Sequence, residues 1–202
     1  MIAVSVLFAR ADSVYRGLSF DVWDEARDAR RYMGPWPVVA HPPCRGWGRL
    51  SHLAKASAEE RALGLLAARR VRQFGGVLEH PHASKLWAAA GLPVPGFVDE
   101  FGGFTLLVDQ GWWGHPAPKP TWLYFCGVDR EAVTASAWDM VTLRRAAGRT
   151  MKLDRAEREA TPEALAQWLV SVAAQAVTPS QGASYTELRP PVTPTWCEGY
   201  AA

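Results

Sequence analysis

Hydrophobic and polar positions along the chain predict strands that alternate with helices. Short apolar runs rich in β-branched residues predict strands at 2–8, 37–40, 76–79, 104–108 and 121–125, with a weaker strand at 18–23. Apolar residues at helical spacing predict a helix after Ser57, where Glu60 completes a capping-box pattern. A second helix is predicted after Thr161 as its N-cap, with Pro162 in the first position. Shorter helices are expected at 24–33 and 84–90.

This alternation predicts an α/β domain over residues 1–177, with a mostly parallel sheet flanked by helices. Residues 178–202 are rich in Pro, Ser and Thr and are expected to form an extended tail. Ligands of such sheets bind beyond the carboxyl ends of the strands. Three polar segments punctuated by Pro or Gly occupy those positions, at 41–49, 79–85 and 109–119. We therefore expect a functional site where these three segments meet.

Composition narrows the class of ligand only slightly. The net charge is +2, so any nucleic-acid binding has to come from a local cluster of charge. Arginine is much commoner than lysine, which leaves a nucleic acid or nucleotide open as ligand, although a GC-rich genome produces the same bias. Three widely spaced cysteines argue against a disulfide framework and favour a reducing, cytoplasmic setting. No apolar stretch is long enough for a membrane span.

Cys44 is the first chemical candidate. Pro42 and Pro43 restrict the backbone just before it and are expected to hold its thiol rigidly at the end of a buried strand. Arg45 and Arg49 are expected to favour the thiolate, which is the nucleophilic form. The alternative is a small buried thiol without chemistry.

The other two segments add an acid, aromatic rings and a cation. Glu79, at the end of a strand, is expected to have a raised pKa and to act as an acid, unless it is simply solvated. Trp112, Trp113 and Lys119 are expected at the same rim, although the tryptophans could equally cap the core. A zinc site is a weaker alternative, since no compact pair of ligands occurs. Its candidate ligands are His41, Cys44, His80, His82 and His115.

Together these segments resemble the cytosine-C5 DNA methyltransferases. The run Pro42-Pro43-Cys44-Arg45-Gly46-Trp47 is similar to the Pro-Pro-Cys-Gln segment that carries the nucleophile of that family. Gly76-Val77-Leu78-Glu79-His80-Pro81 resembles the family's Glu-Asn-Val segment. The chain from Gly111 to Gly127 resembles the third motif, with its apolar strand and closing glycine. Thymidylate-synthase-like enzymes carry a similar Pro-Pro-Cys nucleophile followed by His, where this chain has Arg45.

The methyltransferase resemblance implies a Rossmann-like half-fold and a reaction mechanism. Cys44 would add to C6 of a cytosine, Glu79 would hydrogen-bond N3 and the exocyclic amine, and Lys119 would position the target. A base in duplex DNA would have to be flipped out of the stack. Further substrate contacts are expected from Arg45, Trp47, Arg49, His80, Trp112, Trp113 and His115.

The family's cofactor, S-adenosylmethionine, would contact Phe8 and Asp24. The glycines of its Phe-x-Gly-x-Gly motif are, however, replaced here by Arg10 and Asp12. The 35 residues at 128–162 also leave no room for a target-recognition domain. We therefore expect a reduced relative that modifies a pyrimidine in DNA or in a nucleotide. The alternatives are a non-catalytic relative that binds nucleic acid or protein, and a metal-dependent His/Cys enzyme.

Overall fold

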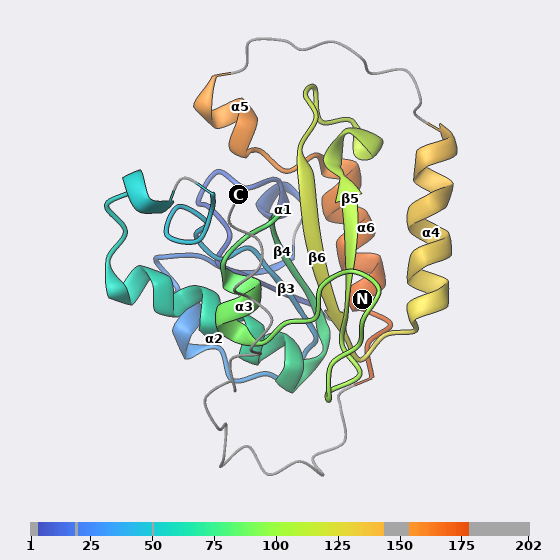
Figure 1. The fold of residues 1–202 in the computed structure, drawn as a ribbon, viewed down its shortest axis with the longest axis horizontal. Helices are drawn as coiled ribbons and strands as arrows, with labels where there is room; N and C mark the ends of the chain where they lie inside the picture. Colours follow the sequence, from blue (N-terminus) through green and yellow to red (C-terminus); the bar gives the residue numbers. More distant parts are fainter. Residues whose placement is uncertain (1–3, 19, 50, 144–153, 178–202) are drawn as a thin grey trace, which may run out of the picture.

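A computed structural model of the chain describes residues 4–18, 20–49, 51–143 and 154–177, and these residues build layers of helices around a sheet (Figure 1). The strands are β1 (Ser5–Leu7), β2 (Asp21–Trp23), β3 (Val38–Ala40), β4 (Gly76–Pro81), β5 (Phe104–Asp109) and β6 (Pro120–Cys126). The helices are α1 (Val14–Gly17), α2 (Ala58–Phe74), α3 (Leu86–Ala90), α4 (Arg130–Leu143), α5 (Arg155–Glu159) and α6 (Glu163–Ala173).

The sheet is mixed, with strand order β2-β1-β3-β4-β6-β5. Strands β1 to β4 are parallel to one another, whereas β6 pairs antiparallel with both β4 and β5. The expected sheet is therefore confirmed as mostly parallel, with one antiparallel strand inserted. Because β6 runs opposite to β4, the beginning of β6 lies beside the carboxyl end of β4, where Pro81 pairs with Thr121.

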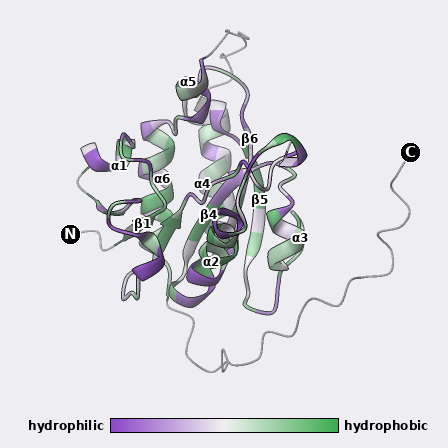
Figure 2. Cartoon of the chain, turned by 90° about the vertical axis from the view of Figure 1, so that its left-hand side faces the viewer, coloured by the Kyte–Doolittle hydropathy of each residue, from purple (hydrophilic) through white to green (hydrophobic). Residues whose placement is uncertain are grey.

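Helices cover both faces of the sheet, and alternating strand residues build one core on each face. Val6, Val39 and Val77 belong to the core under α4 and α6. Their neighbours Leu7, Ala40 and Leu78 belong to the core under α2 and α3. Hydrophobic residues accordingly concentrate on the strands and on the helix faces turned toward them (Figure 2).

The long helix α2 begins as its sequence predicts. The Ser57 side chain accepts a hydrogen bond from the backbone N–H of Glu60 at 3.1 Å, which satisfies one of the free amides of the first turn. Glu60 does not complete the capping box, because its carboxylate accepts hydrogen bonds from Arg45 instead. The helix therefore also holds the segment that follows Cys44.

Three features differ from the expectations. Residues 24–33 form turns and a short 3₁₀ helix (Ala29–Arg31), because Asp28 adopts a left-handed φ of 56° that interrupts an α-helix. Helix α6 has Pro162 rather than Thr161 at its N-cap. Helices α1, α4 and α5 had no prediction. The proposed tail at 178–202 lies outside the described residues, as does the start of the first predicted strand.

Within the described ranges, no helix has both the length and the apolar character that crossing a bilayer requires.

Candidate functional site

The three polar segments come together at the carboxyl edge of β3 and β4. The backbone N–H of Lys85 donates to the carbonyl oxygen of Trp47 at 2.9 Å, which joins the first segment to the second. The N–H of His82 donates to the carbonyl oxygen of Pro120 at 3.1 Å, which joins the second to the end of the third. Polar side chains from distant parts of the sequence therefore share one edge of the sheet.

Glu79 lies at the centre of this edge, and its carboxylate is held from both sides. Ala40 pairs with Leu78 in the sheet, so His41, just after β3, lies beside Glu79 within β4. The Nδ1 atom of His41 lies 3.1 Å from Oε2 of Glu79. On the other side, the amide of Gln110 donates to Oε1 at 2.9 Å and to the Thr121 hydroxyl at 3.0 Å. The carboxylate thus has a fixed orientation while 13% of the side chain remains accessible.

The electrostatics of Glu79 correct the expectation of a raised pKa. Burial opposes its ionisation, but the hydrogen bond from His41 and the positive charge of Lys119 outweigh burial. The pKa of Glu79 is therefore lower than its ordinary value. At neutral pH Glu79 is therefore a carboxylate that accepts hydrogen bonds, and not a protonated carboxylic acid that could act as a general acid.

Cys44 is exposed at the start of a turn, as the nucleophile hypothesis requires. The turn is built by the backbone, since the N–H groups of Trp47 and Gly48 each donate to the Cys44 carbonyl oxygen at 2.9 Å. Desolvation by surrounding protein atoms, followed by the negative charge of Glu79, raises the pKa of the Cys44 thiol. The expected lowering by Arg45 and Arg49 is therefore wrong. Lys119 is the cation that favours the thiolate.

The charge of Lys119 influences the ionisation of both other predicted catalytic residues, Cys44 and Glu79. Burial lowers its pKa, and the negative charges of Glu79, Cys44 and Glu159 oppose that lowering. Its ammonium group donates to the backbone carbonyl oxygens of Glu159 and Ala160, at 3.3 and 2.9 Å. Lys119 thereby attaches the end of α5 to the rim of the site.

The proximity of these charges predicts a specific pH dependence for alkylation of Cys44. Reaction with iodoacetamide requires the thiolate and should rise with pH to a midpoint above that of an exposed peptide cysteine. Glu79→Gln should move the midpoint to lower pH, because it removes a negative charge that opposes ionisation. Lys119→Gln should move it to higher pH. Peptide mass spectrometry can follow Cys44 separately.

Cys126 provides the internal control for this measurement. It is buried, and burial raises its pKa to about 11, so it should stay unmodified in the folded protein over the same range. A midpoint that is unchanged in both variants would contradict the grouping of Cys44, Glu79 and Lys119.

Arg45 and Trp47 hold their loop to α2. The Arg45 guanidinium pairs with Glu60, and the Trp47 indole N–H donates to the backbone carbonyl of Arg61 at 3.2 Å. Gly64 makes room for this ring, because a Cβ there would lie 2.8 Å from the indole nitrogen. Arg49 is exposed and, among the described residues, makes no ion pair. Of these three predicted substrate contacts, Arg49 is therefore the one that is free to reach a ligand.

The other predicted substrate contacts are directed away from the site. His80 is fully buried on the opposite face of β4, beside Trp87, and burial lowers its pKa to about 4. Trp113 packs in the core against Trp168, and Trp112 packs between Trp113 and Trp138. The structure thus places both tryptophans in the alternative role, as parts of the core on the α4 and α6 face.

The candidate metal ligands do not form a cluster in the described part of the chain. His115 is buried, with its Nδ1 atom 2.6 Å from the carbonyl oxygen of Ala117. His41 contacts Glu79, and His80 lies on the other face of the sheet. No group of three or more His, Cys, Asp or Glu side chains able to hold an ion occurs among the described residues.

The two residues proposed to contact S-adenosylmethionine, Phe8 and Asp24, directly follow β1 and β2. Asp24 is 5% exposed, and its carboxylate is occupied by the Arg16 side chain and by the backbone N–H of Arg27 at 2.9 Å. Phe8 has a left-handed φ of 62° at the end of β1, and Arg10 closes the following turn by pairing with Asp12 and Glu159. The Asp24 carboxylate therefore has one hydrogen-bond partner on each oxygen from within the chain.

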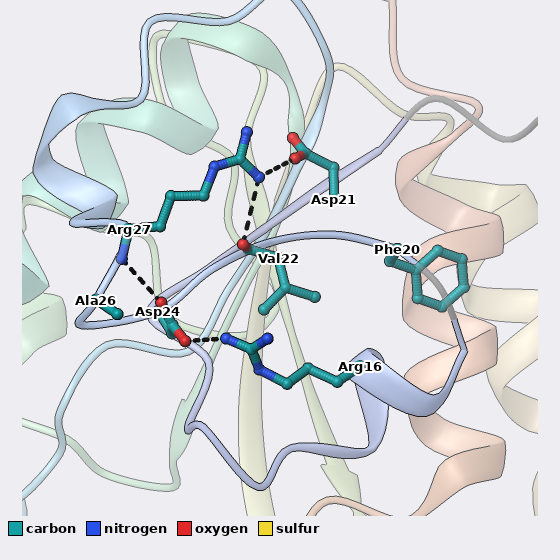
Figure 3. Close-up of a pocket in the computed structure, with 7 residues that line it drawn as sticks. All are labelled: Arg16, Phe20, Asp21, Val22, Asp24, Ala26 and Arg27. Atoms are coloured by element: carbon teal, nitrogen blue, oxygen red, sulfur yellow. Dashed lines mark hydrogen bonds and ion pairs between the residues drawn. The ribbon is translucent and has the colours of Figure 1, made fainter.

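A pocket of about 600 Å³ opens beside Asp24 at the edge strand β2 (Figure 3). It is lined by Arg16, Phe20, Asp21, Val22, Asp24, Ala26 and Arg27. Each acid in the pocket faces an arginine, with Arg16 on Asp24 and Arg27 on Asp21 (Figure 3). The charges of these two acids are therefore compensated within the pocket.

Three site residues were missed, namely His41 and Gln110, which contact Glu79, and Tyr15, which contacts His41. The sequence indicated His41 only as a possible metal ligand, and it gave no role to Tyr15 or Gln110. Gln110 directly follows a strand, within one of the three rim segments, and this was the only local signal. Tyr15 gave none, because its position beside His41 depends on the packing of α1 against the sheet.

Comparison with protein-family models, with curated proteins and with solved structures gives no match for this chain.

Proposed function

We propose that this protein is an enzyme that modifies a cytosine ring, in DNA or in a nucleotide, through covalent addition of Cys44 to C6. The observation that carries the proposal concerns Glu79, whose ionised carboxylate is held by His41 and Gln110. Its charge acts on the exposed thiol of Cys44 and on the ammonium group of Lys119. Perturbed ionisable groups that converge at a sheet edge are typical of catalytic sites.

Glu79 provides the recognition of the base. A carboxylate accepts about four hydrogen bonds, and His41 and Gln110 occupy one position on each oxygen. One acceptor position therefore remains on each oxygen. Once Cys44 has added to C6 and N3 has taken up a proton, the exocyclic amine and the N3–H of cytosine form two adjacent N–H donors that match this pair of acceptors. Uracil and thymine present a carbonyl oxygen in place of the amine, and the carboxylate repels it.

The addition step needs only Cys44 and the cytosine, because the proton that the thiol loses balances the proton that the ring gains. The sulfur of Cys44 forms a bond to C6 and the thiol releases its proton. The electrons of the C5–C6 double bond shift toward the ring nitrogen, and N3 takes up a proton. The N3–H and the amine then donate to Glu79, while C5 becomes nucleophilic. The charge on Lys119 favours the thiolate that starts the addition. This addition by itself requires no methyl donor.

Deuterium exchange at C5 tests this proposal directly. In D₂O, the nucleophilic C5 takes up a deuteron, loses its original proton, and the bond between sulfur and C6 then breaks. We expect deoxycytidine from a single-stranded oligonucleotide, or deoxycytidine monophosphate itself, to gain deuterium by mass spectrometry. Deoxyuridine at the same position should exchange more slowly, because its carbonyl faces Glu79.

The two substrates and a binding measurement make the result decisive. Exchange in the oligonucleotide alone identifies a nucleic-acid enzyme, and exchange in the free nucleotide identifies a nucleotide enzyme. Binding of the oligonucleotide without exchange of either substrate would overturn the proposal and favour the non-catalytic nucleic-acid-binding alternative.

A further inference from the structure

A line of hydrogen bonds behind Glu79 connects three side chains from separate elements. The hydroxyl of Tyr15, on α1, lies 2.8 Å from Nε2 of His41, which follows β3. The Nδ1 atom of His41 lies 3.1 Å from Oε2 of Glu79, on β4. Tyr15 is 1% exposed and His41 is 12% exposed, so the protein shields this line from solvent.

The protons along this line have a single consistent arrangement when His41 is neutral. An ionised carboxylate only accepts hydrogen bonds, so the Nδ1 atom that faces Glu79 must carry a proton. The Nε2 atom then accepts, and its donor is the Tyr15 hydroxyl. Burial and the charge of Glu79 raise the pKa of Tyr15 well above its usual value, so Tyr15 keeps the proton that it donates. Tyr15 therefore selects the tautomer of His41 that can bind Glu79.

The ring of His41 also limits the rotation of the carboxylate. The terminal torsion of a glutamate is broad and imposes little orientation by itself. Here His41 holds Oε2 while Gln110 holds Oε1 from the opposite side. The Tyr15 and His41 rings pack with their centroids 5.3 Å apart, which restricts the imidazole in turn. The acceptor positions that remain on Glu79 consequently point in one direction.

We propose that His41 is a positioning residue that orients the Glu79 carboxylate toward the base, and that Tyr15 sets the His41 tautomer for this purpose. This inference rests on the proposed function, because it concerns the same cytosine site. His41 contacts Glu79 and acts on the substrate only through it. Its loss should therefore reduce kcat for C5 exchange much more than it changes KM.

The first part of the test compares two substitutions of His41 in the full-length protein. His41→Leu removes the donor and should lower kcat for C5 exchange by about 10²-fold, because misorientation of a catalytic group by about 1 Å has an effect of this size. His41→Asn places an amide N–H near the position of Nδ1 and should recover most of that loss. Thermal unfolding confirms that each variant is folded.

The second part observes the tautomer without any need for activity. Two-dimensional ¹H–¹⁵N NMR of the imidazole should show the Nδ1–H form of His41 in the wild-type protein. In Tyr15→Phe, which lacks the hydroxyl donor, the Nε2–H form should become populated and kcat should fall. This variant and His41→Asn still decide the question if His41→Leu does not fold.

The outcomes separate this inference from the proposed function. If the wild-type protein shows no exchange, the proposed function fails, whereas the NMR measurement still reports the tautomer. If the wild-type protein exchanges and the folded variants match its kcat, the positioning role is overturned. A wild-type spectrum with the Nε2–H form would also overturn it, since that form cannot donate from Nδ1 to Glu79.

Discussion

Substitution of Cys44 by alanine is expected to abolish C5 exchange, leaving only the uncatalysed rate. The addition needs a sulfur nucleophile at this position, and no other residue near Glu79 replaces it in the proposed reaction. Cys44→Ser is the matched control, because it retains the shape of the side chain but has a hydroxyl that is a weak nucleophile at neutral pH. Both variants should bind the oligonucleotide as the wild-type protein does.

The loss of exchange should occur without a loss of stability. The turn at Cys44 is closed by backbone hydrogen bonds from Trp47 and Gly48, and the side chain itself is exposed. The free energy of unfolding should therefore change by no more than about 0.5 kcal/mol, the usual range for surface substitutions. Urea denaturation measures this quantity. Exchange that persists in Cys44→Ala would show that another group attacks the ring.

Substitution of Arg72 by methionine is expected to give the largest loss of stability, about 3–5 kcal/mol in the free energy of unfolding. Arg72 is buried on α2, and its guanidinium lies 2.9 Å from the Asp99 carboxylate and donates to the Tyr124 hydroxyl at 3.2 Å. It also donates to the carbonyl oxygens of Ala90 and Gly91, at 3.1 and 2.8 Å. Methionine has a comparable length but leaves Asp99 as a buried charge without its cation.

A second substitution distinguishes charge burial from simple loss of packing. Arg72→Met combined with Asp99→Asn removes both charges and should recover part of the lost stability, since no uncompensated carboxylate remains. Urea denaturation of the two variants gives both values. A loss below about 1 kcal/mol for Arg72→Met alone would show that this ion pair contributes little.

Local sequence patterns were sufficient to predict much of the architecture. Apolar runs located β3, β4 and β6, and a serine followed by helical spacing located the start of α2. These features depend on backbone conformation and side-chain alternation over a few residues, which the sequence specifies directly. The rule that ligands bind at the carboxyl ends of parallel strands then placed the three rim segments together.

The same local patterns could not predict the partners of the polar side chains. Arg45 was expected to act on Cys44 but instead pairs with Glu60, in the first turn of α2. Glu79 was expected to have a raised pKa, but His41 and Lys119 lower it. The nearest charge in space decides such effects, and that charge comes from another part of the chain.

The sequence by itself therefore determined the class of fold, most strands, and the edge of the sheet at which Cys44 and Glu79 lie. Only the tertiary structure decided that β6 is inserted antiparallel between β4 and β5, and that Trp112 and Trp113 pack toward the core. It also decided that Glu79 is held between His41 and Gln110. The physical reason is that strand order and hydrogen-bond partners depend on contacts between residues far apart in sequence. Propensity and periodicity, in contrast, act over one or two turns.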